Sequence, residues 1–122
     1  MDRLEEFEQN GRKFVSIDFS EFKTNEEMSQ LMDESKVLIA THPPKSVHTI
    51  CNMENVRFDT TTKELFANWA KDNEPYVRSG VVIGLDGIKK IMANAVLVMS
   101  GRKNLTFAHS KEKAVEWLLE KG

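Results

Sequence analysis

Short segments rich in β-branched residues alternate with longer amphipathic segments along most of this 122-residue chain. The segments of the first kind are residues 13–18, 47–52, 79–83 and 105–108. Helical segments separate them, and the third and fourth of these are residues 86–100 and 110–120. Strands that alternate with helices predict right-handed crossovers and a largely parallel sheet. We therefore expect an α/β layer fold.

The start of the chain adds a hairpin to this alternation. Asn10-Gly11 separates residues 4–9 from residues 13–18, and this dipeptide favours a type I′ turn because both central residues need a positive φ. The predicted order is β-β-α-β-α-β-α-β-α, with four to five strands, one of them antiparallel, and four helices. Residues 1–122 contain no linker or repeat, so we expect one domain.

The first two helices carry start signals and apolar stripes. Thr24 and Glu27 have capping-box spacing, as do Thr61 and Glu64. In the first helix the spacing predicts a buried face of Met28, Leu31, Met32, Ser35 and Ile39. In the second helix it predicts a buried face of Leu65, Phe66, Trp69 and Ala70, and in the last helix one of Ala114, Trp117 and Leu118.

The third helix is apolar almost all the way round. On a helical wheel of 100° per residue, the apolar residues form one continuous face. We predict that this face is a stripe turned toward the core. Its residues are Ile88, Ile91, Met92, Ala95, Val96 and Met99, with Val98 at its edge. Leu97 points away from this stripe, with Ala93 beside it. Lone exposed leucines are common.

An alternative interpretation gives the side of the third helix that carries Leu97 a function. Leu97, Ala93 and Phe66 would edge an apolar patch that takes a lipid-like ligand, because methionine-bearing helices adapt to irregular shapes. Basic residues at the two ends of the helix would then meet anionic headgroups. These residues are Lys89, Lys90, Arg102 and Lys103.

Composition excludes several classes of function. A formal net charge of −2 and a pI near 5.9 argue against a nucleic-acid-binding protein, which usually has a basic face. Cys51 is the only cysteine, so no internal disulfide forms. No apolar run approaches the ~20 residues of a membrane span, and no apolar signal segment is present. We expect a cytoplasmic protein and leave peripheral membrane attachment open.

Residues with catalytic or ligating chemistry are scattered. His42, His48 and His109 lack the converging ligands of a metal site, and we expect neither a metal nor a cofactor. Gly84 and Gly87 lie between a strand and a helix, where phosphate loops occur. They lack the remaining residues of a dinucleotide or P-loop motif. We interpret them as a structural corner, with a backbone contact to a ligand as the alternative.

Asp59, Thr60, Thr61 and Thr62 stand at the predicted start of the second helix. Backbone amides and the helix dipole favour an anion at such a position. The sequence therefore suggests an anion or phosphorylation site, and the plainer interpretation is that one threonine caps the helix and the others are solvated.

Several local stretches between Arg12 and Leu119, in this order and spacing, carry a family resemblance. They are Val15-Ser16-Ile17-Asp18, Pro43-Pro44-Lys45-Ser46-Val47, Asn73-Glu74-Pro75-Tyr76-Val77, Val81-Val82-Ile83-Gly84, Ser100-Gly101-Arg102, Phe107 and Lys113-Ala114-Val115-Glu116-Trp117-Leu118. Together they resemble the STAS fold of anti-sigma-factor antagonists, and more closely the small stand-alone SpoIIAA-like bacterial group. The resemblance implies similarity to CRAL-TRIO lipid-binding domains.

The chain departs from this family at one position. Phosphorylation-regulated antagonists carry a serine in an Asp-Ser-Ser-Gly turn after the strand that corresponds to residues 47–52. Here the sequence is Cys51-Asn52-Met53-Glu54-Asn55, and threonines follow only after a longer loop.

Three functions follow as hypotheses. The first is a non-enzymatic module that binds a lipid-like ligand, an anionic membrane surface or a protein partner. The second is a phosphorylation-controlled antagonist of a regulatory protein that uses Thr60 or Thr61. The third is a small enzyme with a carboxylate or His48 as its acid–base group. We expect no nucleic-acid partner and leave a homodimer open.

Overall fold

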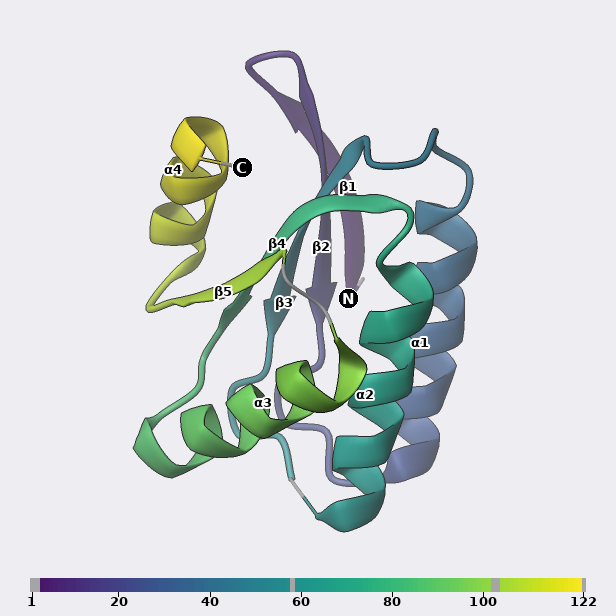
Figure 1. The fold of residues 1–122 in the computed structure, drawn as a ribbon, viewed down its shortest axis with the longest axis vertical. Helices are drawn as coiled ribbons and strands as arrows, with labels where there is room; N and C mark the ends of the chain where they lie inside the picture. Colours follow the sequence, from purple (N-terminus) through teal and green to yellow (C-terminus); the bar gives the residue numbers. More distant parts are fainter. Residues whose placement is uncertain (1–2, 58, 102–103, 122) are drawn as a thin grey trace.

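The computed structural model describes residues 3–57, 59–101 and 104–121, without the side chain of Leu97. Within these residues β1 (Leu4–Gln9) and β2 (Arg12–Asp18) form an antiparallel hairpin. Three parallel strands continue the sheet: β3 (Val47–Asn52), β4 (Val77–Ile83) and β5 (Leu105–Ala108). The order is β1-β2-β3-β4-β5, so β1 and β5 are its edges (Figure 1).

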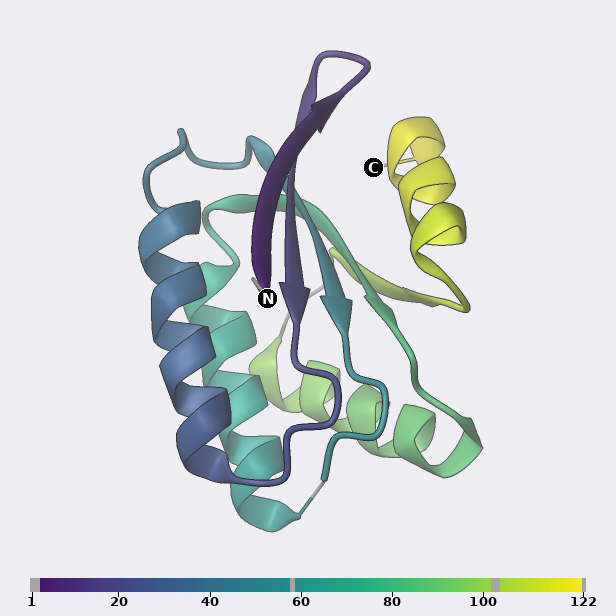
Figure 2. The same cartoon turned by 180° about the vertical axis from the view of Figure 1, so that it is seen from behind.

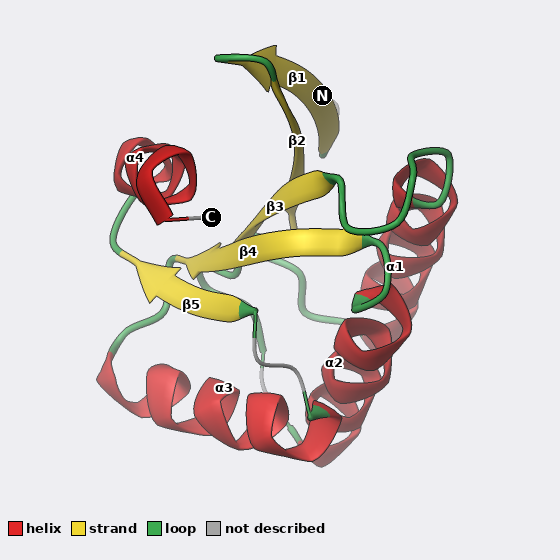
Figure 3. Cartoon of the chain, turned by 45° about the horizontal axis from the view of Figure 1, so that its top comes forward, coloured by secondary structure: helices red, strands yellow, loops and turns green. Residues whose placement is uncertain are grey.

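Four helices in the described residues cover the sheet unequally. They are α1 (Asn25–Ile39), α2 (Thr60–Asn73), α3 (Gly87–Ser100) and α4 (Lys111–Lys121). Figures 2 and 3 show α1, α2 and α3 on one side of the sheet and α4 alone on the other. The predicted α/β class, the element order and the mostly parallel sheet are confirmed.

The larger half of the core lies between the sheet and the helices α1 and α2. Phe19, just after β2, lies at its aromatic centre. Its ring makes edge contacts with Phe66 and Trp69 of α2, at centroid distances of 5.2 and 5.3 Å. Such contacts add to the free energy of burying the rings. They fix α2 against the end of β2.

The smaller half of the core lies under α4. Phe14, Ile50 and Val81 point to this side and are covered by Ala114 and Leu118. Arg12, beside the hairpin turn, donates from Nη1 to the Leu118 carbonyl over 2.7 Å. One helix therefore covers this half of the core, and a side chain from the hairpin binds near its C-terminal end.

Local signals in the first forty residues are confirmed. Asn10 and Gly11 have φ values of 52° and 76°, as a type I′ turn requires. Thr24 caps α1, because its Oγ accepts the Glu27 N–H at 3.2 Å and donates to Glu27 Oε1 at 2.8 Å. The buried face of α1 is the predicted one: Met28, Leu31, Met32, Ser35 and Ile39.

The prediction for α3 is wrong in its orientation. Most of the apolar stripe predicted to face the core faces solvent, with Ile88 76% exposed, Ile91 70%, Val98 82% and Met99 61%. Ala95 is exposed as well. The helix packs mainly on α2, and among its described side chains Ala93 and Val96 are buried. A wheel locates the apolar face but does not identify what covers it.

Gly84 turns the chain from β4 toward α3. Its φ is +84°, and a Cβ there would lie 2.7 Å from Glu54 N and 2.8 Å from Asn52 Oδ1. A Cβ added at Gly87 would have no atom within 4 Å. The turn therefore favours glycine at position 84, which supports the interpretation of these residues as a structural corner.

We predict that Gly84→Ala lowers the free energy of unfolding by about 2 kcal/mol, since both the positive φ and the close approach disfavour a Cβ. Gly87→Ala is the matched control and should leave it unchanged or raise it by up to about 1 kcal/mol, because a Cβ there has open space and alanine is favourable in a helix. Chemical denaturation measures both values. Equal effects of the two substitutions would contradict this account.

Candidate functional site

A small cavity lies between α2, α3 and the strands β3, β4 and β5. Its volume is about 40 Å³, more than the ~10–15 Å³ that a cavity needs to hold one water. Its wall is formed by Cys51, Met53, Phe66, Trp69, Ala70, Val82, Ala93, Val96, Leu105 and Phe107. Apolar walls of this kind favour hydrocarbon over water.

The polar group of Trp69 is already bonded elsewhere. The Trp69 Nε1–H donates to Ser35 Oγ over 2.9 Å, and that hydroxyl donates to the Met32 carbonyl over 2.8 Å. The indole therefore presents its apolar surface to the cavity. An occupant would gain dispersion and hydrophobic energy here, with no hydrogen bond from this ring.

The helix over this cavity has a cation beside it. Lys90 of α3 is exposed, and its Nζ lies 5.8 Å from the centre of the Phe107 ring, which lines the cavity. At this distance the ammonium interacts with the ring face. The site thus combines an apolar interior with a positive charge at its margin.

The structure brings two of the three predicted surface residues together. Phe66 and Ala93 are both buried and both line the cavity, so they lie beneath α3 rather than on its outer surface. The side chain of Leu97 lies outside the described part of the chain, as do Arg102 and Lys103. Sequence reasoning missed the contributions of β5, Leu105 and Phe107, because only the sheet order places them opposite α2.

The predicted anion site at the start of α2 is organised around Asp59. This residue, rather than Thr61, is the N-cap, and its Oδ1 accepts the Thr62 N–H at 2.8 Å. The bond from the Thr62 backbone lowers the pKa of Asp59, as do the Thr62 hydroxyl and Arg57. Thr62 is buried, whereas Thr60 and Thr61 are exposed. A carboxylate thus already occupies the helix terminus, and it would repel a phosphate on a neighbouring threonine.

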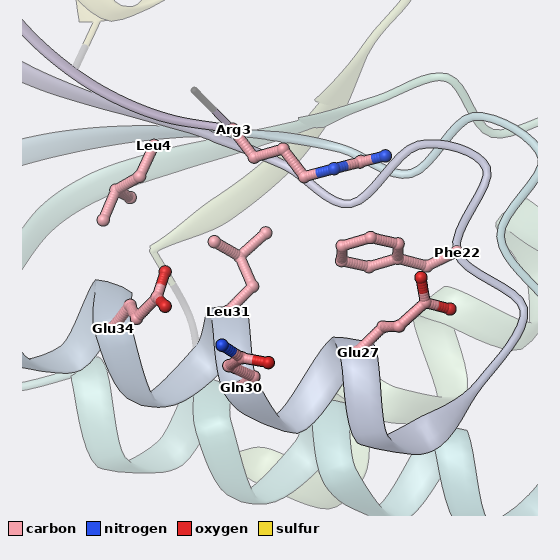
Figure 4. Close-up of a pocket in the computed structure, with 7 residues that line it drawn as sticks. All are labelled: Arg3, Leu4, Phe22, Glu27, Gln30, Leu31 and Glu34. Atoms are coloured by element: carbon pink, nitrogen blue, oxygen red, sulfur yellow. The ribbon is translucent and has the colours of Figure 1, made fainter. Parts of the chain in front are cut away.

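A second hollow, of about 390 Å³, lies between β1, α1 and the segment that joins β2 to α1. Figure 4 shows Arg3 extended over the ring of Phe22, with Glu27, Gln30 and Glu34 rising from α1. The guanidinium carbon lies 4.0 Å from the ring centre. Arg3 Nη1 also donates to the carbonyls of Asp18 and Ser20 over 3.0 and 2.8 Å, so it acts here as a structural group.

His48 lies on the α4 side of the sheet and is fully buried. Burial, with Arg12 and Arg78 nearby, lowers its pKa to about 4. Its Nδ1 and the hydroxyl of Ser79, its register partner on β4, have no hydrogen-bond partner among the described residues. The imidazole is neutral near pH 7 and lines none of these hollows, which disfavours an acid–base role.

Two further properties bear on the chemistry. Among the described residues, no group of three or more His, Cys, Asp or Glu side chains is placed to hold a metal ion. Measured against the length and hydropathy that a membrane span requires, every described helix falls short.

We predict that the protein loses stability in acid because of His48. Its folded pKa of about 4 lies below the ordinary 6.5, so the unfolded chain binds the proton more readily between these values. The contribution of His48 is therefore complete above pH 6.5 and falls by on the order of 3 kcal/mol toward pH 4. Urea unfolding at a series of pH values measures this slope.

His48→Phe and His48→Leu should both flatten the dependence between pH 6.5 and pH 4, whatever their effect at neutral pH. His109→Gln is the control, because His109 is exposed, and it should leave the dependence unchanged. An unaltered slope in both His48 variants would show that another group is responsible.

Comparison with known proteins shows a likeness in fold to solved structures. No protein-family model matches the chain, and no curated protein matches it. A solved structure of an uncharacterized protein of the DUF3478 family from Shewanella loihica PV-4, described as having a SpoIIAA-like fold, superimposes with a TM-score of 0.71. The match covers 94% of this chain and 91% of that one at 10% sequence identity. The fold of this chain is therefore SpoIIAA-like, as the resemblance in its sequence implied.

Proposed function

We propose that the chain is a non-enzymatic module that binds a lipid-like, anionic amphiphile beneath α3, at the surface of a membrane. One observation carries the proposal: an apolar cavity lies under a helix that exposes four large apolar side chains to solvent. In an ordinary amphipathic helix the apolar face covers the core. Here both sides of α3 are suited to apolar contacts.

The cavity determines the class of ligand. Its wall is apolar, and the indole of Trp69 has its N–H bonded to Ser35, so a hydrocarbon chain is a better occupant than a polar molecule. Lys90 beside Phe107 would pair with a carboxylate or phosphate at the end of that chain. An acyl chain with an anionic head satisfies both requirements.

A ligand of this kind needs more room than 40 Å³, so α3 has to move outward when it binds. Its packing favours such a movement, because its main neighbour is α2 rather than the sheet. Gly84, shortly before the helix, and Gly101, directly after it, have positive φ values of 84° and 72°. Residues of this type absorb backbone rotation at little cost.

The outer face of α3 supports contact with a bilayer. Ile88, Ile91, Val98 and Met99 are all more than half exposed, and their transfer from water would contribute on the order of 5 kcal/mol. Amphipathic helices with an apolar face and lysines at the margin lie in the membrane interface. Lys90 would meet anionic headgroups there.

We predict that Ala93→Phe weakens binding of dansyl-undecanoic acid by about ten-fold or more, because the added ring fills the cavity. Ala95→Phe is the matched control: Ala95 is an exposed alanine on the same helix, and its substitution should leave the affinity unchanged. Probe fluorescence measures binding, and circular dichroism checks the fold. No binding to the wild type, or equal affinity of a folded Ala93→Phe variant, would contradict the ligand site.

We also predict that the wild type floats with vesicles of phosphatidylglycerol and phosphatidylcholine, and that an Ile91→Asp, Val98→Asp double variant does not. Val37→Asp is the control, because Val37 is 71% exposed on α1 and lies outside this face. If the double variant instead converts a dimer to a monomer in size-exclusion chromatography, a second copy covers α3 and the membrane role is wrong.

A further inference from the structure

The outer edge of β1 lies at the opposite end of the sheet from β5, and no described strand pairs with it. The Arg3 carbonyl accepts the Asp18 N–H, and hydrogen-bonded pairs alternate along an antiparallel ladder. Residues 5, 7 and 9 therefore bond to β2, while the main-chain groups of Leu4, Glu6 and Glu8 point outward. An edge with such groups is a template for another strand.

The two faces of this edge differ in character. The side chains of Leu4, Glu6 and Glu8 lie on the α1 side, next to the hollow with Glu27 and Glu34. The α4 side has a groove of about 540 Å³, and its apolar surface consists of Phe7, Val115 and Leu119. Phe7 is fixed there by stacking on Phe14, with ring centres 5.0 Å apart.

The charge of this edge determines which partners it can bind. β1 and the two hollows together carry seven glutamates, against the two cations Arg3 and Lys111. Lys13 of β2 offsets part of this charge, since its Nζ lies 3.8 Å from Glu6 and 3.6 Å from Glu8. The edge is still strongly acidic for a chain whose formal net charge is −2.

A second copy of the chain is a poor partner for this edge. A two-fold antiparallel pairing centred on Glu6 would place the two Glu6 carboxylates opposite each other, and like charges in that position are destabilising. The same charges would attract a cationic segment. They therefore select among partners as well as protecting the edge from self-association.

We propose that β1 binds an extended basic peptide segment as an additional strand of the sheet. Main-chain hydrogen bonds to Leu4, Glu6 and Glu8 supply affinity, as in other cases of strand addition. Successive side chains of the segment point to opposite faces. Cationic side chains lie against Glu6 and Glu8 on the α1 side, and apolar ones lie against Phe7 on the α4 side. The partner is thus a segment in which basic and apolar residues alternate.

The test uses a short capped peptide in which lysine and valine alternate. Calorimetry should show binding to the wild type, and hydrogen exchange followed by NMR should show new protection at the amides of Leu4, Glu6 and Glu8. A Glu6→Gln, Glu8→Gln variant should bind about five-fold more weakly or worse. The control variant is Glu54→Gln, Glu64→Gln, at exposed glutamates outside β1 and its two hollows, and it should bind normally.

Two further peptides separate strand addition from simple charge attraction. One has glutamate in place of lysine, and it should not bind. The other keeps its lysines but is N-methylated at alternate residues, which removes the main-chain donors that would face β1, and it should not bind either. Undiminished binding of the methylated peptide, or protection that spares Leu4, Glu6 and Glu8, would overturn the proposal.

Discussion

The central strands are apolar on both faces. Both faces therefore have to be covered, and this determines where the helices lie. In β2, Phe14 points to one side and Val15 and Ile17 point to the other, and all three have no exposed surface. Strands of this kind need cover on both faces. α1 and α2 provide it on one side and α4 provides it on the other, so these three helices have fixed positions.

α3 contributes less to covering the sheet than the other three helices do. It lies beyond α2, buries Ala93 and Val96, and leaves large apolar side chains in solvent. Exposure of such side chains on one helix is unfavourable for a protein alone in water, and patches of this kind usually mark interaction surfaces. The cavity lies on the other side of α3, where Ala93 and Val96 meet Leu105 and Phe107 of β5.

The sequence predicts this structure well where an apolar pattern can pack against only one neighbouring element. The face of α1 is predicted in full, since its one apolar stripe meets the sheet. The stripe of α3 is just as clear in the sequence, yet it is assigned to the wrong side, because periodicity does not identify the neighbour. At the start of α2, four adjacent capping residues compete, and the charged acceptor Asp59 forms the cap. The cavity itself depends on distances between α2, α3 and β5, which no local pattern contains.

The hydrogen bond from Arg12 to Leu118 joins residues 106 positions apart, and this separation has a consequence for synthesis in the cell. Phe14, Ile50, Val81 and Ile83 form a surface on which Ala114 and Leu118 of α4 pack. At about 5–20 residues per second, a ribosome needs a few seconds to proceed from Ile83 to Leu118. Until α4 is made and packs on the sheet, this aromatic and aliphatic surface has no cover from that helix, and exposed apolar surface of this kind makes a partly folded chain prone to aggregation.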